Sequence, residues 1–178
     1  TLGLVIVLGY AGQISLAQAA FYGIGAYAVA LGTTRWDINW WLALLLGLIA
    51  AAVAGAVLGM ATLKLGGHYL AMVTICFQVI FTLVLTNWVA FTGGPDGISN
   101  IKRPPFFIPL NSAQRYAWFA LAALLLVGGL VWWLRGTVLG RSMRAVRENE
   151  IAAEALGVNT PRVKVIAFTL SAVIGALG

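Results

Sequence analysis

The sequence predicts an all-α integral membrane protein with several membrane-crossing helices, a broken helix near the N-terminus and a short helix in a cytoplasmic loop. Of its 178 residues, 61% are hydrophobic and only 9% are charged, which is more apolar surface than the core of a water-soluble domain can use. The apolar residues form long runs, and a helix needs a run of about 20 to cross a bilayer. The only long polar run is residues 141–164.

The basic residues indicate the orientation of the chain. A net charge of +6 would suggest nucleic acid binding in a soluble domain, but these basic residues lie between apolar runs, so no nucleic acid partner is expected. If residues 135–164 are cytoplasmic, alternation of the spans places seven basic residues on that side and four on the other. The seven are Lys64, Arg135, Arg141, Arg144, Arg147, Arg162 and Lys164, and the four are Arg35, Lys102, Arg103 and Arg115. The positive-inside rule therefore agrees with a cytoplasmic loop.

A break interrupts the first apolar run, because residues 9–15 combine two glycines with unusual polarity. Ser15 and Gln18 have the spacing of a capping box, so we expect a helix to restart at Ser15 and continue to about Gly32. Backbone that leaves the helix at membrane depth must be buried in protein or face a cavity. The break therefore either lines a path through the membrane, with the new helix N-terminus directed at an anionic group, or is a packed kink without a ligand.

Residues 40–63 form the next predicted span, after a cluster of tryptophans typical of the membrane interface. Small residues recur at every fourth position of this span and share one helix face. This pattern predicts close packing against a neighbouring helix. The residues are Ala43, Gly47, Ala51, Gly55 and Gly59.

Two further spans follow, at residues 69–91 and 116–134, separated by the turn signal of residues 92–98 and an irregular outer loop. Thr74, Gln78 and Thr82 share one face of the first of these spans, where they either pair with other helices or line a polar path. No metal site is expected, since the single cysteine, Cys76, and the single histidine, His68, have no suitable partners.

The polar run predicts a short amphipathic helix. Arg147, Glu150 and Glu154 share one side, and the apolar side consists of Ile151, Ala152, Ala155 and Leu156. Gly157 is placed for a left-handed cap, and Thr160 with Pro161 for the N-terminus of a further helix. The helix could be an interfacial anchor, but its many alanines favour close packing into a protein groove.

These residues resemble a known family. The segment Glu154-Ala-Leu-Gly157 resembles the EAA loop of ABC-importer permeases, and residues 147–159 (RENEIAAEALGVN) closely resemble the same loop of LivM-type branched-chain amino acid permeases. Residues 9–27, 67–74 and 92–98 are also similar to signatures of that family, in the same order. Gln18 and Gln78 depart from the family, which often has histidine and glutamate there, and this leaves the substrate open.

The resemblance implies a permease subunit of an ATP-driven importer in the bacterial inner membrane, for branched-chain amino acids or, alternatively, for urea, short amides or other small acids. It also implies a second permease, two ATP-binding subunits and a periplasmic binding protein as partners, besides membrane lipid. No phosphate-binding G-x-x-x-x-G-K-[ST] motif is present, so ATP and Mg are expected on the partners and no cofactor on this chain. Residues 1–178 would form one permease domain, a fragment cut at both ends, with residues 141–164 as its coupling loop.

Two groups of candidate site residues follow from the motifs and the resemblance. The residues expected to couple the permease to an ATP-binding subunit are Arg147, Glu150, Ala153, Glu154, Ala155 and Gly157. The residues expected along a translocation path are Gly12, Gln13, Ser15, Gln18, Thr74 and Gln78. A membrane enzyme would need carboxylates or other catalytic groups within its spans, whereas every carboxylate here falls in a loop, and a channel subunit would have no reason for the acidic, alanine-rich helix.

Overall fold

The computed structural model describes residues 2–63, 65, 68–99, 101 and 113–178, and all regular structure in them is helical. This confirms the all-α prediction. In chain order the elements are α1 (Leu2–Leu4), the π-helical η1 (Val5–Tyr10), α2 (Gln18–Thr34), α3 (Trp40–Ala61), α4 (His68–Asn87), α5 (Val89–Thr92), the 3-10 turn η2 (Gly94–Asp96), α6 (Ala113–Gly136), α7 (Val138–Glu148), α8 (Glu150–Ala155) and α9 (Thr160–Ala176).

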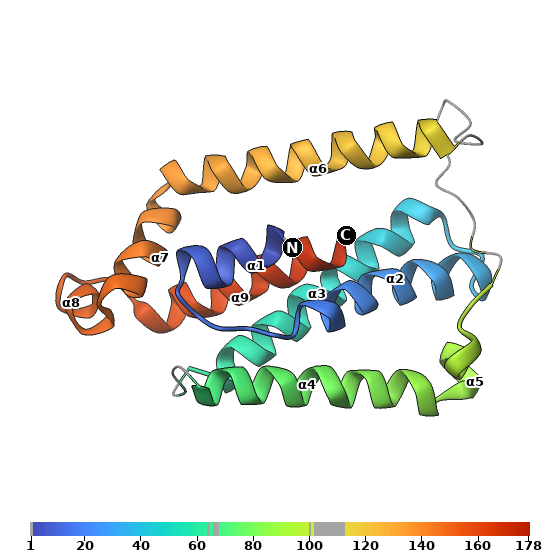
Figure 1. The fold of residues 1–178 in the computed structure, drawn as a ribbon, viewed down its shortest axis with the longest axis horizontal. Coiled ribbons are helices and arrows are strands. Elements are labelled where there is room, and N and C mark those ends of the chain that lie inside the picture. The colour runs from blue at the N-terminus through green and yellow to red at the C-terminus, as the bar shows by residue number, and fades with distance from the viewer. Residues whose placement is uncertain (1, 64, 66–67, 100, 102–112) are drawn as a thin grey trace.

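The long helices lie roughly along one axis in an elongated bundle (Figure 1). The central helices are α1 with η1, α2, α3 and α9, while α4 and α6 lie on opposite sides of them. Helices α7 and α8 lie at one end, and α5 lies at the other together with the turn from α2 to α3. Within the described residues, three helical stretches are long and apolar enough to cross a membrane: Trp40–Ala61, Tyr69–Asn87 and Ala117–Gly136. The predicted multi-span architecture is confirmed.

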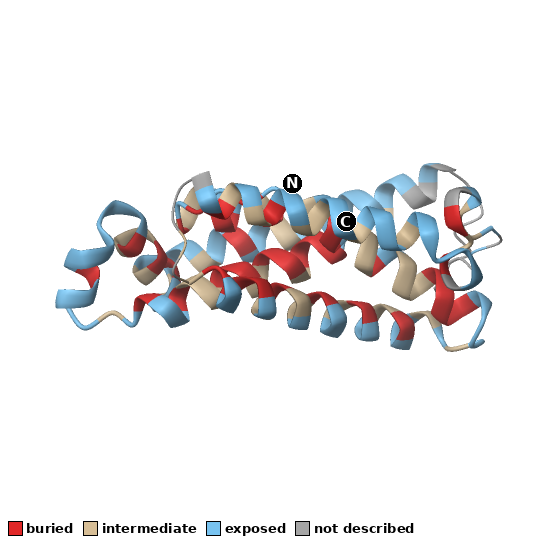
Figure 2. Ribbon diagram, turned by 90° about the horizontal axis from the view of Figure 1, so that it is seen from below, coloured by how far each residue is buried: buried red, intermediate tan, exposed pale blue. Residues whose placement is uncertain are grey.

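The small-residue face of α3 forms the centre of the bundle. All five residues of the predicted stripe are buried, and they face α2 and α9. A Cβ added at Gly55 would lie 2.5 Å from the Cβ of Ala172 and 3.0 Å from the carbonyl oxygen of Phe168, both on α9. Figure 2 shows buried residues, in red, along the middle of the molecule. The predicted interhelical packing is therefore confirmed, and its partners are identified.

Helices α4 and α6 contribute little to this core. Only 11% of the apolar stretch in α4 and 6% of that in α6 are buried, so most of their leucines and valines face outward, with Leu70 and Val131 as buried exceptions. Such surfaces suit lipid or another membrane-embedded chain. The turn predicted at residues 92–98 is confirmed, since Gly93 adopts φ +80° and ends α5. Lys102 and Arg103 lie outside the described residues.

Candidate functional site

The predicted break near the N-terminus is present. The first helix ends at Tyr10 and α2 starts at Gln18, while residues 12–17 form no regular element. Burial alternates along this stretch: Gln13 and Ser15 are buried, whereas Ile14 and Leu16 are 40% and 51% exposed. Alternation with a period of two is the pattern of an extended chain with one side against a packed surface. The break is therefore an extended segment and not a bend within one continuous helix.

The predicted helix start at Ser15 is wrong. Residue Ala17 occupies the N-cap position of α2 and provides no side-chain hydrogen bond. Instead, α4 supplies the acceptors: Oε1 of Gln78 accepts from the backbone N–H of Ala20 at 2.8 Å, and Oγ1 of Thr74 accepts from the N–H of Leu16 at 3.0 Å. Of the two roles left open for Thr74 and Gln78, the structure shows pairing with another part of the chain. Acceptors from α4 make a local capping box unnecessary.

Replacing Thr74 by valine is expected to destabilise the fold. The side chain of Thr74 is fully buried, and its loss would leave the N–H of Leu16 without an acceptor, at a cost of about 1–3 kcal/mol. Thr82→Val is the matched control, because the exposed Thr82 hydroxyl bonds only to the Gln78 carbonyl of its own helix. Thermal unfolding of the purified permease would compare the two variants. Equal melting temperatures would show that Thr74 does not hold the segment.

Gln18 connects three helices inside the bundle. Its Nε2 donates to the carbonyl oxygen of Ser171 at 3.5 Å, and the Ser171 hydroxyl donates to its Oε1 at 3.2 Å. The amide also lies against Gly3 and Gly175, where any added Cβ would overlap with it. Gln18 thus joins α2 to α1 and α9, and no sequence motif indicated Ser171 as its partner.

Gln13 differs from the other polar residues of the break. Its backbone N–H donates to the carbonyl oxygen of Val7 at 2.9 Å, which fixes the segment against η1. Its side chain is 9% exposed, and Oε1 is buried without a hydrogen-bond partner among the described residues. A buried acceptor without a donor costs about 1–3 kcal/mol. Gln13 therefore carries an unused hydrogen-bonding capacity in the interior.

The polar loop forms two helices where one amphipathic helix was predicted. Asn149 is extended, with φ −157° and ψ 109°, and separates α7 from α8. Its side chain accepts from the N–H of Ala152 at 3.0 Å, which makes it the N-cap of α8. Arg147 belongs to the last turn of α7 and therefore does not share a helix face with Glu150 and Glu154. The preference of asparagine for N-caps was the overlooked signal in the sequence.

The expected coupling residues of α8 lie on different sides. Ala153 is 2% exposed and packs into its own chain, in a cluster with Val146 and Val163, so it is not available to a partner. Glu154 and Ala155 are exposed. Glu150 is exposed as well, and its Oε1 forms an ion pair with Nζ of Lys164 at 2.6 Å. The apolar side chains of Ile151 and Leu156 are 82% and 84% exposed, which leaves an outward apolar surface at this end of the molecule.

The predicted left-handed cap at Gly157 is confirmed by its φ of +83°. The N–H of Val158 donates to the carbonyl oxygen of Ala153 at 3.0 Å, and that of Gly157 to Glu154 at 2.9 Å, as in a Schellman motif. The N-cap of α9 is Asn159, one residue earlier than the predicted Thr160, and it accepts from the N–H of Arg162 at 3.1 Å. Capping bonds thus fix both sides of the turn from α8 into α9.

The two predicted groups of residues meet at Arg147. Its guanidinium donates to the carbonyl oxygen of Gly9, 138 positions away in the sequence, at the C-terminal end of η1. A cation is stabilised there because the last carbonyls of a helix carry partial negative charge. Gly12 has φ +67°, and a Cβ on it would lie only 2.7 Å from Cγ of Arg147. The last turn of α7 therefore lies directly against the break.

The comparisons with known proteins agree with this architecture. A family model described as a branched-chain amino acid transport system permease component matches residues 1–178. The chain belongs to this family. The high-affinity branched-chain amino acid transport system permease proteins LivM of Salmonella typhimurium and Escherichia coli are each 36% identical to it, over 96% of this chain and 46% of their own length. This permease chain therefore spans about half the length of those relatives.

A further relative is named for a different substrate. The autoinducer 2 import system permease protein LsrC of Klebsiella pneumoniae is 37% identical, over 51% of this permease chain and 24% of its own length. No solved structure matches the chain. Family membership and the three long apolar helices together establish a membrane component of a transport system.

Proposed function

We propose that the chain is part of the transmembrane permease subunit of an ATP-driven ABC importer for branched-chain amino acids in the bacterial inner membrane. Its partners are a second permease, two cytoplasmic ATP-binding subunits that hold ATP and Mg, and a periplasmic binding protein. The similarity to the LivM proteins over 96% of the chain supports this assignment. The basic residues of the α7–α8 end support its cytoplasmic location.

The contact between Arg147 and the break is the strongest structural support for this function. Helix α8 presents exposed Ile151 and Glu154, and its C-cap Leu156, to a partner, and the turns at Asn149 and Gly157 fix its two ends. Arg147 lies two residues before Asn149 and contacts Gly9 and Gly12. A displacement of α8 by an ATP-binding subunit would therefore reach the extended segment in the membrane directly. An importer needs such a connection between nucleotide state and translocation path.

Gly157→Val is expected to uncouple ATP hydrolysis from transport while the permease still inserts into the membrane. A β-branched residue at φ +83° costs about 1–2 kcal/mol and would change the angle between α8 and α9. No atom lies within 4 Å of the added Cβ, so the effect would arise from the backbone and not from a clash. Substrate-stimulated ATPase activity of the purified complex would be measured, with Gly128→Val in the open part of α6 as the control. If the Gly157→Val complex keeps normal substrate-stimulated ATPase activity and normal subunit stoichiometry, α8 is an interfacial anchor and not the coupling element.

Gln13 is the residue of the break with the strongest reason to meet the substrate. Its buried Oε1 can accept a hydrogen bond from an ammonium group, and an amino acid supplies one. Gln13→Leu removes this acceptor with little change in volume and is expected to lower uptake while assembly stays intact. Thr82→Leu, on the exposed side of α4, is the control. Wild-type uptake kinetics in Gln13→Leu would limit Gln13 to a packing role.

The function is tested by uptake into proteoliposomes that contain the permeases, the ATP-binding subunits and the periplasmic binding protein. We expect leucine to enter only with ATP, and isoleucine and valine to compete with it. ATP-dependent uptake of urea or acetamide, with no uptake of leucine, would support the short-amide alternative. Competition by autoinducer 2 would support the substrate for which the LsrC relative is named. Uptake that continues without ATP would indicate a channel.

A further inference from the structure

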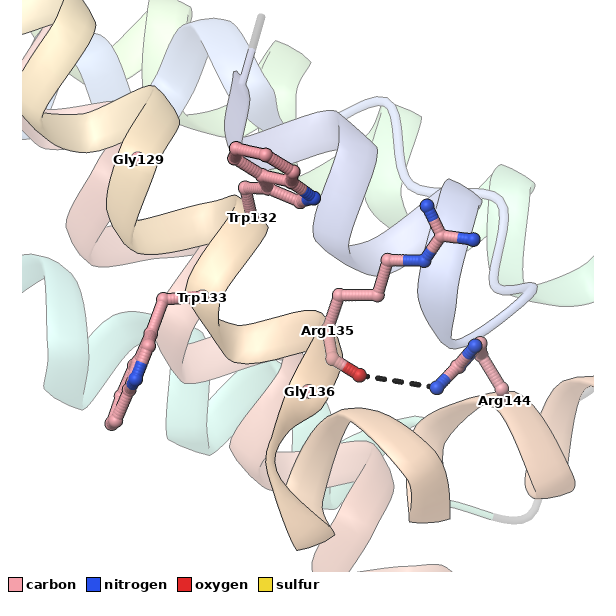
Figure 3. A pocket seen from close by; sticks show the side chains of 6 residues that line it. All are labelled: Gly129, Trp132, Trp133, Arg135, Gly136 and Arg144. Carbon is pink, nitrogen blue, oxygen red and sulfur yellow. Dashed lines mark hydrogen bonds between the residues drawn. The ribbon is translucent and has the colours of Figure 1, made fainter.

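An open pocket of about 560 Å³ lies where α6 meets α7. Its lining residues are Gly129, Trp132, Trp133, Arg135, Gly136 and Arg144. Figure 3 shows Trp132 and Arg135 extending to one side of α6 and Trp133 to the other, with Arg144 approaching from α7. None of these lining residues takes part in the contact between Arg147 and the break. The pocket is therefore a separate feature from the site described above.

The pocket is positively charged and contains no carboxylate among its lining residues. Arg144 is fixed in place, because its Nη2 donates to the carbonyl oxygen of Arg135 at 3.1 Å and its Nε donates to that of Gly140 at 3.4 Å. The guanidinium of Arg135 forms no hydrogen bond or ion pair with any residue that the structure describes. Two adjacent guanidinium groups, one of them without such a partner, favour a ligand with an anionic phosphate group.

The surroundings of the pocket favour a lipid as the source of that phosphate. Trp132 and Trp133 are 74% and 70% exposed near the end of a membrane-crossing helix, where indole rings lie at the headgroup level. Farther along α6, Leu125, Leu126 and Leu130 are 67%, 71% and 51% exposed. They continue the pocket as an apolar surface for acyl chains, and Gly129 leaves room beside the helix. Inorganic phosphate or a nucleotide has no acyl chain that could contact this apolar extension.

We propose that the corner between α6 and α7 binds the phosphodiester headgroup of an anionic phospholipid in the leaflet on the α7 side, held by Arg135 and Arg144 beside Trp132. Basic pockets beside membrane helices on the cytoplasmic side suit this chemistry. The acyl chains lie along the exposed leucines of α6. Because Arg144 bridges α6 and α7, the bound headgroup contacts both helices at the point where the chain leaves the membrane.

For the test, the full-length permease complex is placed in phosphatidylcholine nanodiscs that contain phosphatidylglycerol and is then extracted from them. Native mass spectrometry measures how much phosphatidylglycerol the complex retains. Arg135→Gln is the main variant, because the Arg135 guanidinium makes no hydrogen bond or ion pair to the described residues whose loss would disturb their fold. We expect it to weaken retention about fivefold. Arg135→Lys keeps the charge and should retain most of the binding. Arg141→Gln, which removes an exposed charge of α7 outside the pocket, should have no effect.

Four results would overturn the proposal. Equal retention by the wild type and Arg135→Gln would show that the pocket does not hold the lipid. An equal loss in Arg141→Gln would reduce the effect to general charge attraction. Equal retention of phosphatidylcholine would remove the requirement for an anionic headgroup. Complete displacement by excess inorganic phosphate would identify a site for a soluble anion instead.

Discussion

Gly55→Leu is expected to prevent stable assembly of the bundle. The Cβ position at Gly55 already lies 2.5 Å from the Cβ of Ala172 and 3.3 Å from the Cα of Thr169. These atoms belong to the backbone or are bound directly to it, so they cannot rotate away. Overpacking of a tight core typically costs about 1–3 kcal/mol and can cost more where the backbone must move. To make room for the leucine side chain, α3 and α9 would have to separate.

The measurement is the yield of monodisperse, detergent-extracted permease in size-exclusion chromatography. Ala50→Leu is the matched control, since it places the same side chain on an exposed position of the same helix. Helix propensity cannot account for a loss, because leucine is favoured over glycine in a helix by up to about 1 kcal/mol. Equal yields of the two variants would contradict the α3–α9 contact.

Gly12→Val is expected to abolish most of the transport. Valine at φ +67° is strained by about 1–2 kcal/mol, which shifts a two-state equilibrium about five- to thirtyfold. The added Cβ would also lie 2.7 Å from Cγ and 3.4 Å from Cα of Arg147. The last turn of α7 must therefore move away from the break, and the contact of Arg147 with Gly9 would be lost. ATP-dependent uptake by reconstituted complexes is the readout.

A double-mutant cycle separates the two effects of this substitution. Arg147→Ala removes Cγ and the guanidinium, so it should relieve part of the clash but none of the backbone strain. We expect the double variant to be more stable than the sum of the single effects predicts, with an interaction energy of about 0.5–3 kcal/mol. Thermal unfolding measures the stability of the wild type, the two single variants and the double variant. If the two stability changes simply add, Gly12 and Arg147 are not in steric contact.

Features set by local sequence could be predicted well. The stripe on α3 follows from a period of four along one helix, and the cap at Gly157 follows from a glycine after the last apolar position. The existence of the break also followed from its glycines and polar residues. Each of these depends on a few neighbouring residues and on a backbone rule that holds in any fold.

Features that depend on distant parts of the chain could not be predicted. Arg147 and Gly9 are 138 positions apart, and neither segment contains a sequence signal that predicts contact with the other. The acceptors at the start of α2 come from Thr74 and Gln78 of α4, 58 positions away, and not from the local capping box. Ala153 was assigned to a partner surface from its place in the loop motif and its small side chain. In the structure it packs inward against residues of α7 and α9, which lie outside the motif.

The alternating burial of residues 12–17 restricts how this segment can move. A slip by one residue would turn Gln13 and Ser15 to the exposed side and bring Ile14 and Leu16 into the packed interior. Such a register is disfavoured, because the polar groups would lose their protein surroundings and two apolar side chains would have to fit where smaller or polar ones are packed. The segment therefore cannot slide by one residue along the helices it packs against. A displacement of Arg147 would therefore move residues 12–17 as one piece, with the alternation of buried and exposed side chains preserved.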